Sequence, residues 1–491
     1  MATHEMSEVP FLLERHTGSF DQGSPEPQDD PERGISDSMR RRLVITLIVI
    51  LLAFEIGGQL IPGPMVRVIE SISCDRYWRV HGLSGHIPEH LCNIPTVQTE
   101  VATVKGYSDL LEGLLSTICA IPYGLMADRY GRRQAIRLTV PGFLLNAMIT
   151  NSALWFSNTF PLKGIWLASF SWIIGGGPAV ALVVIWTMLA DLTTDSKRAM
   201  LFFRVGLASQ IAGFISSATS SGLMALNPWI PLLVGCATVT AGLGCALSLP
   251  ETMNLAVKSQ NATVYRDQGV ESEPVKSPPR YARLLRKVER VIHPYRFIFS
   301  SRLLLLLLSF AVFQVAHGSA AFLTQYISTR FNWTLARAQL LSSLHAATTI
   351  PVFVFLLPYL STKVLNRLPL AWRDLYIARF SIISLTVGSL GVGISPYISV
   401  LIPSLCLHAL GAGFALAMRS LATALVNREE TARLYAAIEI LQSMGTVLGS
   451  LCFTNAFKSA LLMSGIGAGL VWILSSLLFA FVGVTLLILR V

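Results

Sequence analysis

The chain has 491 residues, of which 53% are hydrophobic and only 13% are charged, and its mean hydropathy is +0.58. Soluble domains carry about 25% charged residues, so this composition excludes an ordinary soluble protein and predicts an all-α polytopic membrane protein. The net charge of +10 would suit a nucleic-acid partner, but the basic residues lie mainly in short links between apolar runs. We therefore expect a lipid bilayer around the chain and no nucleic acid bound to it.

Apolar runs of membrane-spanning length divide the chain into four parts. Residues 1–42 form a polar tail, rich in Pro, Glu, Asp and Ser, that we expect to be disordered. Residues 43–250 and 303–491 each carry six apolar runs, and 251–302 is a polar connector. Each run is long enough to cross about 30 Å of hydrocarbon as a helix. The twelve expected spans are 43–66, 104–126, 136–157, 164–190, 200–223, 228–249, 303–326, 338–360, 375–394, 397–419, 433–456 and 464–489.

The placement of lysine and arginine predicts the orientation of these spans. With both termini in the cytoplasm, most of the 38 basic residues fall on the inner side, as the positive-inside rule requires. We expect a multi-pass protein of the plasma membrane with this topology. Within the connector, residues 281–292 combine apolar and basic side chains at helical spacing. This pattern predicts an amphipathic helix on the inner membrane surface, with a solvated link as the alternative.

Ionisable side chains inside a hydrocarbon span are expensive and are candidates for function. Glu55 lies near the middle of the first span, where it is a candidate proton acceptor; a structural carboxyl paired within the bundle is the alternative. Glu439 in the eleventh span is a second candidate for proton coupling, unless it pairs with a base near the cytoplasmic end. Gln314 and His317 share one face of the seventh span and are candidates to line a central cavity.

Two further groups of polar residues have a structural interpretation. Lys105 precedes Asp109 by one turn near the outer end of the second span, and Glu112 shares the face of Asp109. The i,i+4 spacing favours an ion pair, so we interpret Lys105 and Asp109 as a surface salt bridge. His345 and His408 are single histidines on apolar helices, and we interpret each as a hydrogen-bonded core residue.

The second and third spans are joined by Gly124-Leu-Met-Ala-Asp-Arg-Tyr-Gly-Arg-Arg133. This link resembles the cytoplasmic loop of major facilitator superfamily transporters, G-x-L-A-D-R-x-G-R-R, with Met126 in place of the usual Leu. Its glycines permit tight turns, and a merely basic inner loop is the alternative interpretation. In that family the acid and bases of the loop join an acid at the cytoplasmic end of the fourth helix. The resemblance therefore implies a gating network of Gly124, Asp128, Arg129, Gly131, Arg132, Arg133 and Asp191.

Other segments are similar to those of fungal members of the same superfamily. Pro250-Glu251-Thr252 is similar to the P-E-T that follows the sixth helix of many facilitators, and the long first outer loop is similar to that of a fungal group. Cys74 and Cys92 of this loop face the outside in the expected topology, where disulfides persist. We expect a disulfide between them, with two free thiols as the alternative. Asn332-Trp333-Thr334 also faces outside and is a candidate glycosylation site at Asn332.

The resemblance implies two six-helix halves that move a small organic solute by alternating access, driven by protons. We favour export of a metabolite or toxic compound; nutrient uptake and a non-transporting membrane sensor are the alternatives. The sequence contains no G-x-x-x-x-G-K-[ST] loop, no metal-ligand spacing and no evident pair of nucleophile and base. We therefore expect no ATP-driven step, no cofactor, no metal and no enzymatic activity, in a protein that acts as a monomer.

Overall fold

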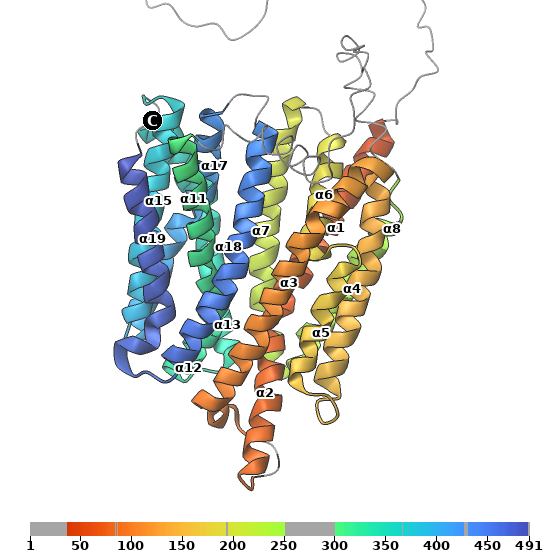
Figure 1. Cartoon of the computed structure of the whole chain (residues 1–491), viewed down its shortest axis with the longest axis vertical. Helices are drawn as coiled ribbons and strands as arrows, with labels where there is room; N and C mark the ends of the chain where they lie inside the picture. Colours follow the sequence, from red (N-terminus) through yellow and green to blue (C-terminus); the bar gives the residue numbers. More distant parts are fainter. Residues whose placement is uncertain are drawn as a thin grey trace, which may run out of the picture.

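The structure is a computed structural model that describes residues 37–83, 85, 87–192, 195–250, 300–365, 367–426 and 431–489. The regular elements of this described part are helices, arranged as one bundle (Figure 1). The disorder expected before residue 37 and the amphipathic helix expected at 281–292 fall outside the described residues. The first helix already begins at Asp37. Residues 37–42, which we had expected to belong to the disordered tail, are therefore helical.

The N-terminal half, defined here as residues 37–250, runs back and forth along the bundle. Its elements are α1 (Asp37–Leu60), α2 (Pro62–Val80), η1 (Glu89–Cys92), α3 (Pro95–Tyr130), α4 (Arg132–Trp155), η2 (Leu162–Gly164), α5 (Ile165–Ser169), η3 (Phe170–Ile173), α6 (Gly177–Asp191), α7 (Asp195–Leu226) and α8 (Trp229–Leu247).

The C-terminal half, defined as residues 300–489, has the same alternation. Its elements are α11 (Ser301–His317), η5 (Gly318–Phe322), α12 (Leu323–Phe331), α13 (Leu335–Pro351), η6 (Val352–Leu356), α14 (Leu357–Tyr359), η7 (Leu360–Val364), α15 (Leu370–Ile394), α16 (Ile398–Ala409), η8 (Leu410–Gly413), α17 (Phe414–Ala424), α18 (Thr431–Ala460), η9 (Gly465–Gly469) and α19 (Leu470–Ile488).

Each of the twelve expected spans falls on a helical segment, some of them interrupted by short 3-10 or π turns. Nine helical segments of the described part are long and apolar enough to cross a membrane. The remaining spans fall on α3, α4 and α7, which are 36, 24 and 32 residues long and carry more polar side chains. The chain thus has the all-helical, two-half architecture that the apolar runs predicted.

The first two spans differ from expectation at one end of the bundle. Pro62 lacks a backbone N–H and interrupts the first helix after Leu60, but α2 then continues to Val80, well beyond the expected end at 66. The segment around Cys74 is therefore helical, although we had assigned it to a loop. In Figure 1, α2 projects furthest at the lower end of the bundle.

We name the two ends of the bundle after their landmarks. The disulfide end carries Cys74 and Cys92 and lies at the bottom of Figure 1; the motif end carries Gly131 and Arg132 and lies at the top. Between the halves, α3 packs against α18 and α7 packs against α13. These two contacts join the halves along the middle of the bundle.

The hydrophobic core is divided differently at the two ends. At the motif end, one buried cluster consists of N-terminal residues such as Leu47 and Ile185, and a second consists of C-terminal residues such as Phe310 and Leu421. At the disulfide end the clusters mix the halves: Leu335 of α13 is buried among N-terminal residues, and Ala102 of α3 among C-terminal ones. The halves therefore share a core at the disulfide end and keep separate cores at the motif end.

Matching arginines stabilise the motif end of each half. Arg137 of α4 donates to the carbonyl of Leu247 at the end of α8, at 3.2 Å. Arg379 of α15 donates to the carbonyl of Leu486 near the end of α19, at 2.9 Å. The last carbonyls of a helix have no partner within the helix and favour a cation. In each half the same pair of helices, third and sixth, is thus joined in the same way.

Candidate functional site

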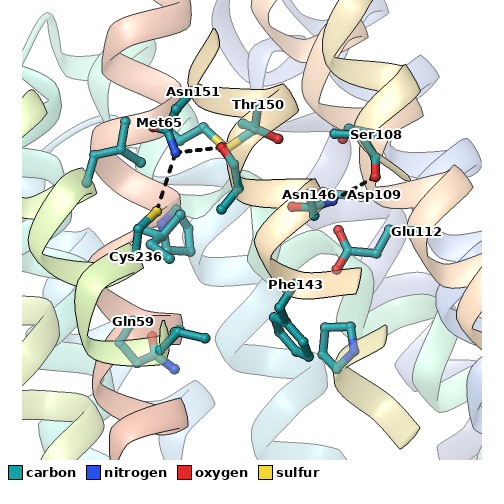
Figure 2. Close-up of a pocket in the computed structure, with 18 of the residues that line it drawn as sticks. Gln59, Met65, Ser108, Asp109, Glu112, Phe143, Asn146, Thr150, Asn151 and Cys236 are labelled. Carbon is teal, nitrogen blue, oxygen red and sulfur yellow. Dashed lines mark hydrogen bonds between the residues drawn. The ribbon is translucent and has the colours of Figure 1, made fainter. Parts of the chain in front are cut away.

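A cavity of ≈510 Å³ lies within the N-terminal half (Figure 2). The described residues that line it come from α1 to α6 and from α8. Its size suits a small organic molecule. Because the lining residues all belong to the N-terminal half, the cavity differs from the central one that we expected between the halves. Its polar lining includes Glu55, Gln59, Lys105, Asp109, Glu112, Asn146 and Asn151.

Glu55 lies five residues before the end of α1 and lines this cavity, half-buried. Its Oε1 accepts a hydrogen bond from Gln59 Nε2, one turn along the helix, at 3.3 Å. Gly213 of α7 leaves room for the carboxylate, because a Cβ there would lie 3.2 Å from Glu55 Oε1. This hydrogen bond pairs Glu55 within the bundle, so both the proton acceptor and the structural carboxyl stay open as predictions for it.

Two further carboxylates enter the cavity from α3. Lys105 Nζ lies 2.6 Å from Asp109 Oδ2, so the predicted ion pair is present. The Asp109 side chain is 43% exposed, in keeping with the predicted surface position, and both residues also line the cavity. Glu112, one turn beyond Asp109, projects from the same side of the cavity (Figure 2). The Lys105 ammonium also lies 5.8 Å from the ring centroid of Phe322, across the boundary between the halves.

Aromatic side chains form the apolar wall of the cavity. The ring of Phe143 on α4 makes edge-to-face contacts with Phe54 at 5.3 Å and with Trp172 at 4.8 Å. Sequence reasoning missed Phe143 and Asn151 as lining residues. Nothing in the local sequence distinguishes these two from other side chains that face lipid or core.

Two polar groups of the wall lack a hydrogen-bond partner within the described residues. They are the indole Nε1–H of Trp172, a residue only 4% exposed, and the buried Oδ1 of Asn151. The Nδ2 of Asn151 does donate, to the carbonyl of Ala147 at 2.8 Å. An unpaired buried polar group costs about 1–3 kcal/mol. A ligand that pairs with these atoms would recover part of that cost.

At the motif end, the expected link is shorter than predicted. Helix α3 continues through Gly124 to Tyr130, so Gly131 alone separates it from α4. Gly131 has φ +101°, which side chains rarely adopt, whereas Gly124 is helical with open space around it. The turn role expected for Gly124 is therefore wrong.

The basic part of the motif reaches the fourth span as the resemblance implied. Arg132 Nη1 forms an ion pair with Asp191 at the end of α6 and donates to the carbonyl of Thr187 at 2.9 Å. Arg129 stacks over Tyr130, with 5.6 Å between guanidinium and ring centroid, and Arg133 follows Arg132 in the first turn of α4. The side chain of Asp128 lies outside the described residues. The contact tethers the start of α4 to the end of α6.

The candidates in the C-terminal half lie apart from the cavity. Gln314 Nε2 donates to Thr446 Oγ1 at 3.1 Å, and His317 stacks on Phe313 with 5.8 Å between ring centroids. Glu439 is 61% exposed and accepts from Arg419 Nη2 at 2.6 Å, which matches the alternative that we gave for it.

Arg419 also donates to Gln442, at 2.7 Å. Sequence reasoning missed Arg419, although a lone arginine in an apolar span is a signal by the rule that identified Glu55. His345 Nε2 and His408 Nδ1 lie 3.0 Å apart. Both histidines are therefore hydrogen-bonded within the bundle, as predicted.

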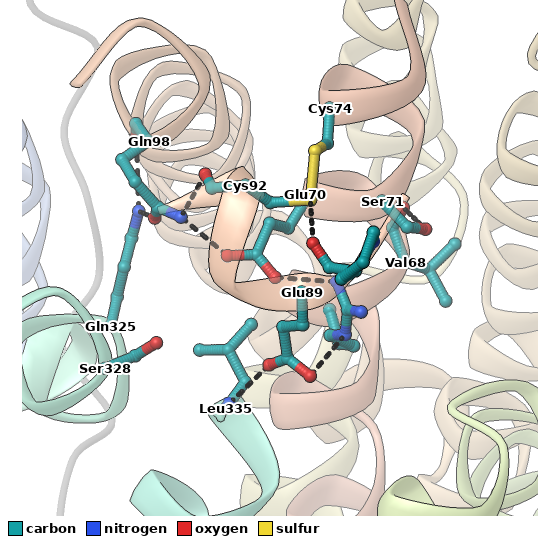
Figure 3. Close-up of polar contacts among 12 residues, drawn as sticks. Val68, Glu70, Ser71, Cys74, Glu89, Cys92, Gln98, Gln325, Ser328 and Leu335 are labelled. Atoms are coloured by element: carbon teal, nitrogen blue, oxygen red, sulfur yellow. Dashed lines mark hydrogen bonds and ion pairs between the residues drawn. A yellow bond between two sulfur atoms is a disulfide. The ribbon is translucent and has the colours of Figure 1, made fainter. Parts of the chain in front are cut away.

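At the disulfide end, polar contacts link the two halves around the Cys74–Cys92 disulfide (Figure 3). Glu70, 1% exposed, accepts from Arg67 Nη1 at 2.8 Å and from Gln98 Nε2 at 2.6 Å. Gln325 Nε2 of the C-terminal half then donates to Gln98 Oε1 at 2.8 Å. A buried carboxylate is thus paired, and its network continues into the other half.

The segment around Cys92 makes direct contacts with α12 and α13. Glu89 Oε1 accepts from the backbone N–H of Leu335 at the start of α13, at 2.7 Å, a favourable position for an anion. Asn93 Nδ2 donates to the carbonyl of Ser328 at 3.2 Å and to Asn332 Oδ1 at 2.8 Å. Asn332 remains exposed, in a left-handed conformation with φ 52°. Its glycosylation stays a prediction.

Comparison with known proteins identifies relatives along most of the chain. A sequence model of the Major Facilitator Superfamily matches residues 101–450. The MFS-type transporter aprT of Aspergillus flavus is 42% identical over 454 residues, which cover 91% of this chain and 88% of that protein. The MFS efflux pump atnC of Emericella nidulans is 29% identical over 467 residues, covering 92% of this chain and 89% of the pump.

Solved structures share the fold at low sequence identity. The nucleoside transporter NupG aligns with a TM-score of 0.63 at 12% identity, covering 91% of this chain and 99% of NupG. A D-xylose-proton symporter aligns with a TM-score of 0.61 at 12% identity, covering 90% of this chain and 96% of the symporter. At such identities the likeness concerns the fold alone.

Proposed function

The chain belongs to the Major Facilitator Superfamily and is a secondary transporter of a small solute, and from this premise we propose that it exports an organic metabolite in exchange for protons. The carboxylate-lined cavity of the N-terminal half carries this proposal. It combines the volume for an organic solute with Glu55, an ionisable group in the middle of a span.

The direction of transport rests on the relatives. Two of them are named efflux pumps: atnC at 29% identity and ustT of Aspergillus flavus at 25% identity over 429 residues. No feature of the cavity favours uptake over export. Export therefore remains the proposal, and uptake is an outcome of the experiment below.

We assign the motif end to the cytoplasm and the disulfide end to the outside of the plasma membrane. Disulfides persist on the oxidising side of a membrane, and the basic motif suits the inner side. In this orientation the halves are joined on the outside and keep separate cores on the inside. Such a state would receive solute from the cytoplasm, and Arg132 and Asp191 would take part in the inner gate.

Glu55 is our first candidate for proton coupling and Glu439 the second. Glu55 lines the solute cavity, so its protonation would change the charge that the solute meets. Glu439 lies elsewhere, and its protonation would break the ion pair with Arg419. Through Glu55, solute and proton would be coupled at one site. Through Glu439, they would be coupled only by a conformational change in the C-terminal half.

The test measures metabolite pools inside and outside cells that lack the gene, and in the same cells supplied with wild type, Glu55→Gln or the exposed-residue control Asp75→Asn. Wild type and Asp75→Asn are expected to release a compound that the other two strains retain. Release by wild type should rise as the external pH falls, because the inward proton gradient grows. Depletion of a compound from the medium would indicate uptake instead. Equal pools in all strains would reject the proposed metabolite export and leave Glu55 a structural role.

A further inference from the structure

The lining of the cavity in the N-terminal half has more carboxyl groups than bases. Three carboxylates line it, from Glu55, Asp109 and Glu112, and among the described lining residues the one base is Lys105. Lys105 is already engaged, because its ammonium lies 2.6 Å from Asp109 Oδ2. The hydrogen bond from the neutral amide of Gln59 to Glu55 adds no positive charge.

Uncompensated carboxylates in a bundle that spans a membrane are expensive. Asp109 and Glu112 lie one helical turn apart on α3 and project from the same side of the cavity (Figure 2), so each raises the cost of the other's charge. A solute with a positive charge would offset this repulsion. An anionic solute would add to it.

Aromatic side chains of the lining, beside Glu112, offer contacts for an apolar body with rings. Phe54, Phe143 and Trp172 form a continuous series of edge-to-face contacts along the lining. Aromatic faces also attract cations. The Oδ1 of Asn151, which has no hydrogen-bond partner among the described residues, supplies an acceptor to a bound molecule, and the buried indole of Trp172 lies beside the Glu112 carboxyl group. The Asn151 acceptor points to a ligand independently of the carboxylates.

We propose that this cavity binds the transported solute as an organic cation. The solute carries a protonated or quaternary nitrogen beside Asp109 and Glu112, and an apolar, ring-bearing body against Phe54, Phe143 and Trp172. The inference rests on the proposed transport function and deepens it by naming the class of substrate.

The experiment compares two probes of the same shape and opposite charge on the purified full-length protein. Tetraphenylphosphonium and tetraphenylborate each carry four phenyl rings around a central atom. Labelled tetraphenylphosphonium should bind saturably, and unlabelled tetraphenylborate should not displace it. Glu112→Gln and Asp109→Asn should each weaken binding about tenfold. Asp75→Asn, which removes an exposed carboxylate at the disulfide end, should bind as wild type does.

Several results would overturn the inference. They are displacement by tetraphenylborate, absence of binding of the cation, and unchanged affinity in folded Glu112→Gln and Asp109→Asn. The comparison of the two probes on wild type needs no variant, so a variant that fails to fold does not prevent the test.

Metabolite profiling separates this inference from the proposed function. If the strain that lacks the gene retains a compound without a cationic nitrogen, the substrate class is wrong and transport stands. If no pool changes while tetraphenylphosphonium binds through Glu112, the proposed transport fails and the cation site stands. Retention of compounds that carry a basic or quaternary nitrogen supports both.

Discussion

At the disulfide end, residues of both halves share two buried clusters, whereas at the motif end each half has a cluster of its own. Among the hydrogen bonds of the described residues, three that join the halves, Gln98–Gln325, Glu89–Leu335 and Asn93–Ser328, lie at the disulfide end. Each such bond contributes about 0.5–1.5 kcal/mol. Opening the disulfide end must therefore break an apolar and a polar interface together, while the motif-end cores remain intact when the halves separate.

The largest expected effect comes from locking the disulfide end. Ser221 Oγ of α7 donates to the carbonyl of Ala336 on α13 at 2.7 Å, so these positions lie side by side and are suitable for a test of a cysteine cross-link between the halves. We expect Ser221→Cys with Ala336→Cys to lose transport completely after oxidation and to regain it with a reductant. Flux in proteoliposomes measures both states.

The control for this cross-link is each single cysteine variant under the same oxidant, with reductant-treated wild type to account for the natural disulfide. Full turnover by an oxidised protein that is shown to be cross-linked would contradict our expectation that the joined disulfide end has to open during transport. It would mean that transport does not require the disulfide end to open.

A smaller effect is expected from removal of the Cys74–Cys92 disulfide. Its cysteines are 18 residues apart in sequence, and closing a loop of about this length stabilises a fold by about 3 kcal/mol in the chain-entropy model. In Cys74→Ser with Cys92→Ser, residues 87–93 and 325–335 should exchange amide hydrogens faster. Exchange at 132–191 should stay as in wild type. Equal acceleration at both regions would show that the two ends are not independent.

The smallest effect is expected within the motif end. Gly131 has φ +101° and ψ 149°, a region that side chains enter at a cost of about 1–3 kcal/mol. Gly131→Ala should therefore lower the thermal unfolding temperature. Gly124→Ala is the matched control, because Gly124 is helical with open space around it, and it should unfold no earlier than wild type. Equal unfolding temperatures for the two variants would contradict the inference that the backbone conformation at position 131 requires glycine.

The sequence predicted the spans because each needs a long apolar run, and it predicted the Arg132–Asp191 contact through the resemblance of the motif. It failed at Cys74, where α2 continues beyond the apolar run and hydropathy no longer reports a helix. The spacing of Lys105 and Asp109 indicated their ion pair but not its position in a cavity, because spacing along a helix does not fix the rotation of that helix in the bundle.

Contacts between distant helices were beyond prediction for a related reason. Gln98 and Gln325 meet only because α3 and α12 approach at the disulfide end, and neither residue carries a local signal of that approach. Phe143 and Asn151 likewise face the cavity through the packing of α4. An apolar or amide residue in a span looks the same in sequence whether it faces lipid, core or solute.

The paired arginines Arg137 and Arg379 have a consequence for the history of the chain. The hydrogen bonds that join them to the partner helices go to backbone carbonyls: that of Leu247 for Arg137, and those of Leu486 and its neighbours Leu487 and Leu489 for Arg379. A backbone acceptor is present whatever the side chain, so the partner helices can change in sequence without loss of the contact. Two halves descended from one ancestral gene segment would then retain the same arginine-to-carbonyl contact between their third and sixth helices after their sequences have diverged. The shared origin of the halves would then be visible in this pair of contacts between an arginine and a backbone carbonyl, although an alignment of the two half-sequences would not reveal it.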